Sequence, residues 1–373
     1  MPKDTIAFIS TYAHPSRDSV ESTLREAFPE YRLQNIVLND VVKAHPGWLV
    51  PNAGYVAVEF GAKILNRRST LRDAYFRTTY LFRKIRDAMR GVIDPARHVF
   101  SFQTQSLYDT CVPGVPHYLY TDHTHLSNLE SLYFDRRLLR SPRWLALERT
   151  IYENAQRVFT RSHNVSADLV KHYGIPPDKI VCVYAGANVK VPADFAPANE
   201  GYGNRRILFV GSDWERKGGP VLIEAFRQVV RVLPDAHLTI VGAKPELNVP
   251  GCTVLGHVPL GELSALYARS SVFCMPTRLE PFGIAFLEAM LHRLPVVATT
   301  EGALPDMVQE GVTGRLVTPG DASQLAAALI DVLGDAERCR RLGEAGYALA
   351  SERYTWKAVG RRMRAEILRG QVN

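Results

Sequence analysis

The chain has 373 residues, which is long for a single hydrophobic core and suits two domains. Hydrophobic residues make up 46% and charged residues 22%, as in an ordinary globular protein. No apolar run approaches the roughly 20 residues that span a bilayer, which excludes a membrane-spanning helix. The first residues enter a strand-like run at once, so we expect no export signal.

The five cysteines stand singly, without a C-x-x-C pair. They are Cys111, Cys182, Cys252, Cys274 and Cys339. An odd, scattered set argues against a disulfide framework or a zinc site and favours a reducing cytoplasm.

The formal charge of +7 is concentrated in the first half of the chain. Residues 1–195 hold 25 Lys and Arg against 19 Asp and Glu, a net of +6, and the remainder holds 20 against 19, a net of +1. This distribution predicts an anionic partner for the first half, such as phosphate, an acidic glycan or a membrane surface. We expect no nucleic acid partner, because no known reader motif accompanies the charge.

Strand-like and helical segments alternate along the chain, which predicts an α/β protein with parallel sheets. In the first half we expect strands at 5–10, 31–38, 98–103, 117–121 and 157–162. Residues 191–204, rich in Pro, Gly and Ala, are predicted to link two domains. In the second half we expect strands at 206–211, 237–242, 271–277, 295–300 and 314–320, and helices at 220–233, 262–270 and 321–335.

Residues 60–92 contain nine basic residues against two acidic ones. The basic residues are Lys63, Arg67, Arg68, Arg72, Arg77, Arg83, Lys84, Arg86 and Arg90. A mostly apolar stripe at helical spacing accompanies them, made of Leu71, Tyr75, Thr78, Phe82, Ile85 and Met89. The segment is therefore either a surface helix with a solvated basic face or a helix that docks on anionic lipid headgroups.

The segment 209–219, FVGSDWERKGG, places a strand end at Gly211 and delivers Arg216 and Lys217 just before a helix. Two cations at the carboxyl end of a parallel strand can bind a diphosphate, although an exposed basic turn would look the same. The spacing is not that of a P-loop, and no G-x-G-x-x-G follows a strand.

The segment 275–290, MPTRLEPFGIAFLEAM, predicts a loop and then a helix that begins near Ile284. The N-terminus of a helix presents unpaired N–H groups and a partial positive charge, which suits a phosphate. Glu280 in the loop and Glu288 in the helix are candidate acceptors for sugar and ribose hydroxyls. Alone, the pair would equally be one loop acid and one solvated helical acid.

In this order, FVGSDWERKGG, TIVG, EPFGIAFLEAM and PVVATTEGALPDMVQEGVTGRLV resemble the retaining GT-B glycosyltransferases of family four, particularly bacterial enzymes that elaborate lipopolysaccharide and surface glycans. The resemblance is strong over 205–355 and extends back through 161–189. It implies two Rossmann-like domains whose parallel sheets face each other across a cleft. Residues 1–190 would bind the acceptor and 205–355 the donor, with the helix 356–373 packing back on the first domain.

The resemblance also implies roles for the donor-side residues. Glu280 would lie near the hydroxyls of the transferred sugar, and Glu288 would bind the ribose. Arg216 and Lys217 would contact the diphosphate. Gly211, Phe282, Gly283, Ile284 and Leu287 complete the expected donor site.

On the acceptor side, YLYTDHTH at 118–125 resembles the strand that places a histidine beside the sugar. His123 is the first candidate for that position, and His125 and Asp122 are further candidates on the acceptor side. The first loop, STYAHPSRDSVES at 10–22, departs from the family pattern because it lacks the usual glycines, which leaves its part in acceptor binding undefined.

The expected activity is retaining transfer of a hexose from a nucleotide-diphosphate sugar to a hydroxyl of a glycan or a lipid-linked acceptor. No D-x-D follows a strand, so we expect no metal and no cofactor. We expect a cytoplasmic protein that contacts the inner face of an anionic membrane through residues 60–92. Alternatives are a non-hydrolysing nucleotide-sugar epimerase, which shares this fold, and an inactive nucleotide-sugar-binding or membrane-scaffold protein.

Overall fold

The computed structural model describes residues 3–12, 15–131, 133–188 and 201–372. It divides into two compact units. Unit 1 comprises Met1–Glu130, Phe134–Tyr184 and Val359–Asn373, and unit 2 comprises Ser131–Tyr133 and Ala185–Ala358. The last boundary falls inside α14 (Trp356–Val372). Most of the linker predicted at 191–204 lies outside the described residues.

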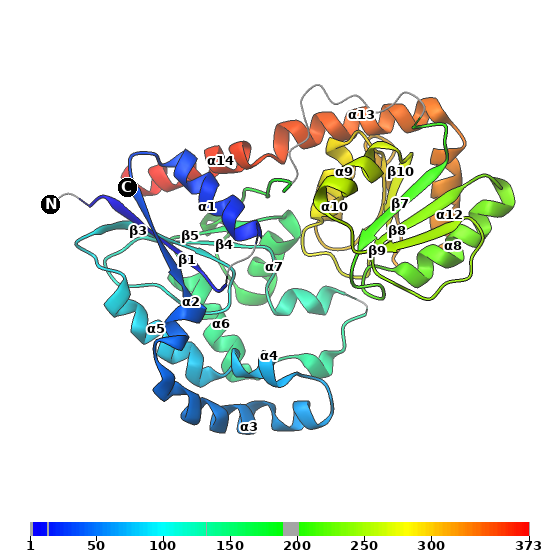
Figure 1. Ribbon diagram of the computed structural model, residues 1–373. Coiled ribbons are helices and arrows are strands. Elements are labelled where there is room, and N and C mark those ends of the chain that lie inside the picture. The colour runs from blue at the N-terminus through cyan, green and yellow to red at the C-terminus, as the bar shows by residue number, and fades with distance from the viewer. Residues whose placement is uncertain (1–2, 13–14, 132, 189–200, 373) are drawn as a thin grey trace. The chain divides into compact units, whose positions relative to one another are not determined.

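Unit 1 contains a six-stranded parallel sheet in the order β2-β1-β3-β4-β5-β6 (Figure 1). Its strands are β1 (Thr5–Ser10), β2 (Arg32–Val37), β3 (His98–Thr104), β4 (His117–Thr121), β5 (Arg157–Thr160) and β6 (Ile180–Cys182). The five strands predicted in this half are confirmed to within a few residues, and β6 was missed because it has only three residues.

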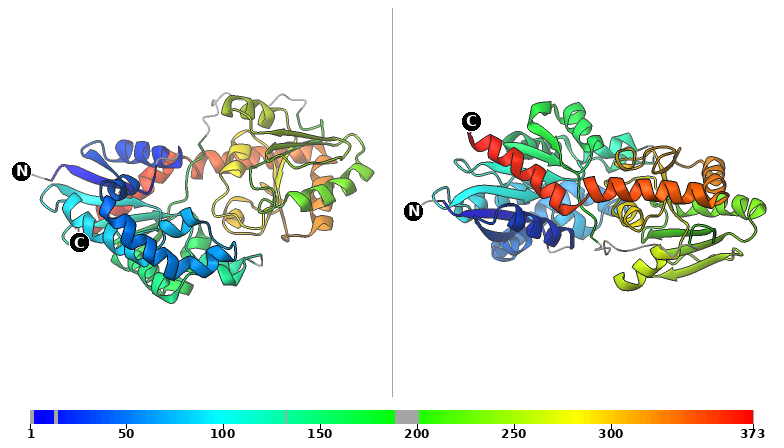
Figure 2. Two further views of the ribbon diagram at one scale, coloured as in Figure 1. Left: turned by 60° about the horizontal axis from the view of Figure 1, so that its bottom comes forward. Right: turned by 90° about the horizontal axis from the view of Figure 1, so that it is seen from above.

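Helices cover both faces of this sheet (Figure 2). They are α1 (Pro15–Ala27), α2 (Leu38–Lys43), α3 (Leu49–Leu65), α4 (Leu71–Tyr75), α5 (Thr79–Val92), α6 (Pro142–Asn154), α7 (His163–Tyr173) and the second part of α14. Buried side chains of α5, α6 and α7 form one core with β1 and β4. On the opposite face, alternate positions of β3, β4 and β5 carry aromatic rings, with centroid separations of 5.4 Å for Phe100–Tyr118 and 6.1 Å for Tyr118–Phe159. α14 follows that face, where the Tyr118 hydroxyl donates to the carbonyl of Ile367 (3.4 Å).

The single helical stripe predicted for residues 71–89 is wrong. The segment is divided between α4 and α5, because Thr70 and Thr78 each accept a hydrogen bond from a backbone N–H of the following helix and cap it. Leu71, which was assigned to the apolar stripe, is largely exposed, whereas Phe82, Ile85 and Met89 of α5 are buried.

Unit 2 has a second six-stranded parallel sheet in the order β12-β11-β10-β7-β8-β9. Its strands are β7 (Arg206–Gly211), β8 (His237–Gly242), β9 (Cys252–Gly256), β10 (Val272–Met275), β11 (Val296–Thr299) and β12 (Gly314–Val317). The helices are α8 (Gly219–Val232), α9 (Leu260–Ala268), α10 (Ile284–Leu291), α11 (Leu304–Met307), α12 (Ala322–Leu333) and α13 (Ala336–Arg353). The strands and helices predicted for this half are confirmed, and β9 is an additional edge strand.

In each sheet the strand order reverses direction at one point. In unit 1 the chain places β2 on one side of β1 and β3 on the other, and in unit 2 it places β8 on one side of β7 and β10 on the other. The loops at the carboxyl ends of strands flanking such a reversal diverge and leave room for a ligand. The topology therefore directs attention to the loops after β1 and β3 and to those after β7 and β10.

No helix in the described part of the chain combines the length and the apolar character needed to cross a bilayer.

Gly343 in α13 offers a test of the packing in unit 2. A Cβ atom at this position would lie 1.9 Å from the carbonyl oxygen of Arg293, whereas one at Gly61 in α3 would have no neighbour within 4 Å. We expect Gly343→Ala to lower the free energy of unfolding by about 1–3 kcal/mol because the backbone must shift. Gly61→Ala should raise stability slightly because alanine favours a helix. Thermal denaturation followed by circular dichroism measures both effects. A melting temperature of Gly343→Ala equal to that of the wild type would contradict this packing.

Candidate functional site

The loops that follow β7 and β10 are bonded to each other. The amide of Arg278 donates to the carbonyl of Arg216 (2.8 Å), and Nη1 of Arg216 donates to the carbonyl of Leu279 (2.9 Å). Oγ1 of Thr277 donates to the same carbonyl of Arg216 (3.1 Å). A Cβ atom on Gly218 would lie 1.8 Å from the carbonyl oxygen of Pro276, and φ of Gly218 is +78°, so only glycine allows this approach.

The loop after β11 joins the same cluster. The amide of Ala303 donates to the carbonyl of Glu280 (3.2 Å). A Cβ atom on Gly302, at φ +58°, would lie 2.0 Å from that carbonyl oxygen. Three loops from the carboxyl edge of the sheet therefore fix the backbone of Glu280.

The side chain of Glu280 forms an ion pair with Lys217. Only 7% of the Glu280 side chain and 15% of the Lys217 side chain are exposed. A buried pair of this kind is costly to break, because removal of one partner leaves an uncompensated charge. Gly211, at the end of β7, lies beside the stem of this lysine, since a Cβ atom there would be 3.1 Å from Cγ of Lys217.

Arg216 is also paired within the protein. Its Nε donates to Asp213 (3.0 Å), in addition to the bond from Nη1 to Leu279. The structure thus brings three of the predicted residues together, Arg216, Lys217 and Glu280, with both cations bonded to protein acceptors.

Gly283 and Ile284 lie at the N-terminus of α10, as predicted. Gly283 is the residue before the helix and has φ +99°, a conformation that favours glycine. The first N–H groups of the helix are therefore available to an anion near Glu280. Phe282 and Leu287 are buried, so their side chains contribute packing within unit 2.

Glu288 is buried in α10 and accepts a hydrogen bond from the hydroxyl of Tyr267 (3.3 Å). Burial raises the pKa of Glu288 to about 7, because the charged form loses water. The carboxyl group of Glu288 thus contacts Tyr267, whereas that of Glu280 is paired with Lys217. The part played by Tyr267 was not foreseen, because residues 21 positions apart on separate helices give no local signal.

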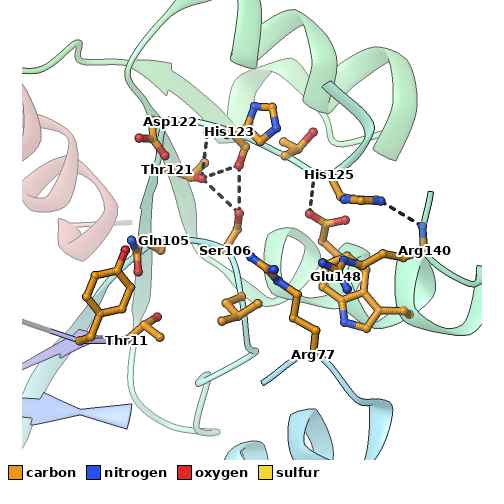
Figure 3. Close-up of a pocket in the computed structure, with 14 residues that line it drawn as sticks. Thr11, Arg77, Gln105, Ser106, Thr121, Asp122, His123, His125, Arg140 and Glu148 are labelled. Atoms are coloured by element: carbon orange, nitrogen blue, oxygen red, sulfur yellow. Dashed lines mark hydrogen bonds between the residues drawn. The ribbon is translucent and has the colours of Figure 1, made fainter. Parts of the chain in front are cut away.

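Unit 1 has a pocket of about 240 Å³ at the carboxyl ends of β1, β3 and β4 (Figure 3). It is lined by Thr11, Tyr12, Arg77, Gln105, Ser106, Leu107, Thr121, Asp122, His123, Thr124, His125, Arg140, Trp144 and Glu148. The loop after β1 contributes Thr11 and Tyr12, although it lacks the family's glycines. The three acceptor-side residues predicted from sequence, Asp122, His123 and His125, all line this pocket.

His123 is held through its backbone. Its carbonyl accepts hydrogen bonds from Oγ1 of Thr121 (2.9 Å) and from Oγ of Ser106 (3.1 Å). Burial lowers the pKa of the imidazole, so the ring is neutral at pH 7. The imidazole is therefore suited to hydrogen bonding with a hydroxyl.

His125 and Asp122 are occupied by other protein groups. Nε2 of His125 accepts from the amide of Arg140 (3.0 Å), and the amide of His125 donates to Oε1 of Glu148 (2.9 Å). Burial lowers the pKa of His125 to about 3. Asp122 forms an ion pair with Arg161 at 3.4 Å. These two residues thus shape the pocket wall.

The pocket residues that were missed as site candidates include Arg77, Gln105, Arg140 and Glu148. Arg77 was counted among the basic surface residues, and Arg140 and Glu148 stand in a segment without a recognisable motif. Gln105 has φ +70°, a strained backbone conformation that is often found at functional sites.

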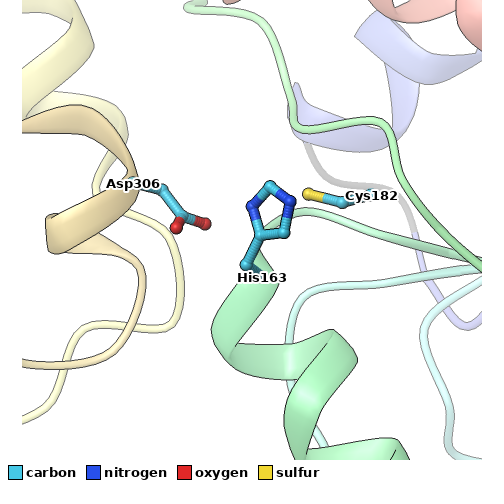
Figure 4. A group of neighbouring side chains, drawn as sticks. All are labelled: His163, Cys182 and Asp306. Atoms are coloured by element: carbon cyan, nitrogen blue, oxygen red, sulfur yellow. The ribbon is translucent and has the colours of Figure 1, made fainter. Parts of the chain in front are cut away.

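Two groups of metal-ligand residues occur in unit 1. His163 of α7 and Cys182 of β6 lie with ligand atoms within 4.8 Å of each other (Figure 4). Glu130, Asp168 and His172 form the second group, but Glu130 already accepts from Lys171 (2.7 Å) and His172 (2.6 Å). Among the described residues of unit 1, the first group supplies two ligand atoms and the second is engaged in ion pairs, so neither offers an open set of ligands within this unit.

Two family models match the chain. Residues 204–335 match glycosyl transferases group 1, and residues 64–191 match Glycosyltransferase Family 4.

Curated relatives match over part of their length. One is the MMP alpha-(1->4)-mannosyltransferase of Mycolicibacterium hassiacum, 31% identical over 233 residues, which are 58% of this chain and 56% of the relative. Another is the GDP-mannose-dependent alpha-(1-6)-phosphatidylinositol monomannoside mannosyltransferase of Mycolicibacterium smegmatis, 36% identical over 174 residues, which are 42% and 45%. The chain thus spans about half the length of these relatives.

Solved structures match over nearly the whole chain. Sucrose-phosphate synthase from Thermosynechococcus elongatus has a TM-score of 0.71 and 19% identity over 99% of both chains. WaaG, a glycosyltransferase involved in lipopolysaccharide biosynthesis, has a TM-score of 0.67 and 15% identity over 97% of this chain and 99% of its own. The two family models show that the chain belongs to the group 1, family 4 glycosyltransferases, and the solved structures show that it has the GT-B fold.

Proposed function

We propose that the protein is a retaining hexosyltransferase that takes its sugar from a nucleotide-diphosphate donor bound in unit 2. The observation that carries the proposal is the buried Lys217–Glu280 pair, which three loops hold at the sheet's reversal point beside the N-terminus of α10. This arrangement offers a cation and helical N–H groups to a diphosphate and a carboxylate to sugar hydroxyls.

The proposed reaction breaks the bond between the anomeric carbon and the diphosphate and forms a bond from that carbon to the acceptor oxygen. Arg216, Lys217 and the N-terminus of α10 stabilise the charge that develops on the departing diphosphate. A diphosphate oxygen on the same face takes the proton of the acceptor hydroxyl. Glu280 orients the transferred sugar, and no residue of the chain needs to act as a nucleophile.

The names of the relatives support a hexose such as mannose or glucose as the transferred group. One curated relative is GDP-mannose-dependent, and HepE of Anabaena, with a TM-score of 0.64 and 17% identity, was solved in complex with UDP and glucose. In this proposal Glu288 accepts hydrogen bonds from the ribose hydroxyls. The acceptor is a sugar or a lipid-linked glycan bound in the pocket of unit 1, with His123 near the transferred hexose.

The epimerase alternative receives less support. It would use an acid–base cluster of Asp122, His123 and His125, but Asp122 is paired with Arg161 and Nε2 of His125 is occupied by the amide of Arg140. Acceptor-dependent release of UDP or GDP from a nucleotide sugar tests the transferase directly. Release of neither nucleotide, with interconversion of the sugar, would favour the epimerase.

We further propose that unit 1 docks on an anionic membrane at the cytoplasmic face. The apolar surface involved differs from the stripe predicted within 60–92. It lies on α3 and the start of α4, where Val50, Val58 and Leu65 are more than 80% exposed and Leu71 is 67% exposed. The exposed residues Arg67, Arg68 and Arg72 follow α3 in the chain. Exposed aliphatic side chains beside basic residues are typical of interfacial binding.

We expect donor affinity to rise between about pH 6 and 8, centred on the pKa of Glu288, and to level off above this range. Ribose hydroxyls donate to the ionised form of Glu288, and its pKa of about 7 leaves that form incompletely populated below pH 7. Glu288→Gln should remove this pH dependence and weaken binding by about 1–3 kcal/mol. Calorimetric titration of the nucleotide across this range measures the donor affinity, and identical pH profiles for the wild type and Glu288→Gln would remove Glu288 from the site.

The raised pKa of Glu288 also predicts that the free energy of unfolding falls from pH 4.5 to 7 in the wild type more than in Glu288→Gln.

We expect Arg216→Ala and Lys217→Ala to lower kcat more than they raise KM for the donor, because the charge they meet is largest in the transition state. Steady-state kinetics with a varied donor separates the two effects. A rise in KM with kcat unchanged would assign these residues to ground-state binding.

We expect the reaction to be independent of metal and to retain its rate in EDTA. A requirement for added Mg²⁺ or Mn²⁺ would contradict this expectation.

Vesicle sedimentation tests the membrane proposal. Wild-type protein should bind anionic vesicles at low salt and bind less at high salt, because ions screen the arginines. Val58→Glu should reduce binding at both salt concentrations. Val232→Glu is the matched control, since Val232 is also exposed but lies in unit 2. Absence of wild-type binding at low salt would end this proposal and leave the transferase proposal intact.

A further inference from the structure

The pocket of unit 1 contains two arginines that face one shared carboxylate. Arg77 forms an ion pair with Asp73, and Nη2 of Arg140 lies 3.5 Å from the other oxygen of the same carboxylate. Lys63, whose Nζ donates to the carbonyl of Leu139, lies nearby, and burial together with the charge of Arg140 lowers its pKa.

The other acidic groups of the pocket offset these cations only in part. Asp122 is paired with Arg161. Glu148 accepts hydrogen bonds from the hydroxyls of Tyr173 (2.6 Å) and Tyr152 (3.1 Å), and burial raises its pKa to about 7. The neutral imidazoles of His123 and His125 add no charge. Arg77 and Arg140 therefore share the carboxylate of Asp73, which leaves a net positive charge at this end of the pocket.

Arg140 is held in one orientation by aromatic rings. Its guanidinium lies 4.8 Å from the ring centroid of Trp144 and 5.6 Å from that of Phe60. Burial and the nearby charge of Arg77 lower the pKa of Arg140 to about 9. A stacked guanidinium keeps its N–H donors in its plane, where they can bind an oxyanion at two points.

Arg77 stands where two cavities adjoin. The pocket of about 240 Å³ and a neighbouring one of about 560 Å³ share Thr11, Tyr12, Arg77 and Leu107. Ser106, Thr121 and Gln105 supply hydroxyl and amide groups around the first cavity (Figure 3). Such a wall suits a ligand with one anionic group and several hydroxyl groups.

We infer that the acceptor carries a phosphate group and that Arg77 and Arg140 bind it. Two guanidinium groups that share one carboxylate suit a phosphate, which carries about −1.5 to −2 at neutral pH and presents three acceptor oxygens. The inference rests on the proposed transferase function, because it specifies the acceptor of that reaction. It also accounts for two arginines that lie close enough for the charge of Arg77 to lower the pKa of Arg140 and that share the carboxylate of Asp73.

The test uses the full chain with glycerol 3-phosphate and inorganic phosphate as probes, and glycerol as the uncharged control. Both phosphates should raise the melting temperature of the wild type, and glycerol should not. Arg77→Gln and Arg140→Gln should weaken phosphate binding about tenfold or more, because each removes charge-assisted hydrogen bonds. Arg83→Gln is the matched control, since it removes an exposed arginine from α5.

Further variants locate the site and its ligand. Val232→Glu should leave phosphate binding unchanged, because Val232 is exposed in unit 2 and lies outside the candidate donor site. Arg77→Lys keeps the charge and should bind with intermediate affinity, which provides a test if Arg140→Gln does not fold. Vesicles of phosphatidic acid distinguish a lipid source: binding that is lost in Arg77→Gln, without binding of glycerol 3-phosphate, would assign the phosphate to a lipid headgroup.

Two results would overturn the inference. One is that no phosphate probe binds the wild type in solution or on vesicles. The other is that Arg77→Gln and Arg140→Gln bind phosphate as tightly as Arg83→Gln. Nucleoside diphosphate binding, measured on the same samples, should persist in all unit 1 variants. If the wild type does not bind a nucleoside diphosphate, that result would instead count against the transferase proposal itself.

Discussion

The ion pair between Lys217 and Glu280 is the interaction on which the organisation of unit 2 around its candidate site depends. The two residues are 63 positions apart and lie on loops that follow different strands. Backbone bonds between Arg278 and Arg216, and between Ala303 and Glu280, hold those loops together. Because both side chains are largely buried, loss of either would leave a charge in a poorly solvated place, which makes the three loops mutually dependent.

Both units use the same topological device for different chemistry. Each sheet reverses its strand order at one point, and the loops there carry the candidate residues. In unit 2 the site combines a carboxylate, a cation and a helix N-terminus, which suits both parts of a nucleotide sugar. In unit 1 it combines neutral imidazoles, hydroxyl groups and two arginines, which suits a polyol with a phosphate group.

The basic excess of the first half serves two proposed purposes rather than one. Exposed arginines after α3 accompany the aliphatic side chains Val50, Val58 and Leu65, whereas Arg77 and Arg140 line the pocket. A surface that attracts anionic lipid and a pocket that binds phosphate would bring the same class of acceptor to unit 1. The distinction between them depends on solvation, since exposed charges are screened by salt and enclosed ones much less.

The sequence alone determined most strands, the helices of the second half, and the family. These depend on local hydrophobic period and on motif order, as in the segments around Arg216 and Glu280. It did not predict the break between α4 and α5, because two threonine caps outweighed an apolar stripe that continued through them. Only the tertiary structure decided that Arg77 enters a pocket, that Val58 faces solvent and that Glu288 meets Tyr267. Burial and pairing arise from segments distant in the chain, so the same side chain gains its charge state and its role only after those segments have packed.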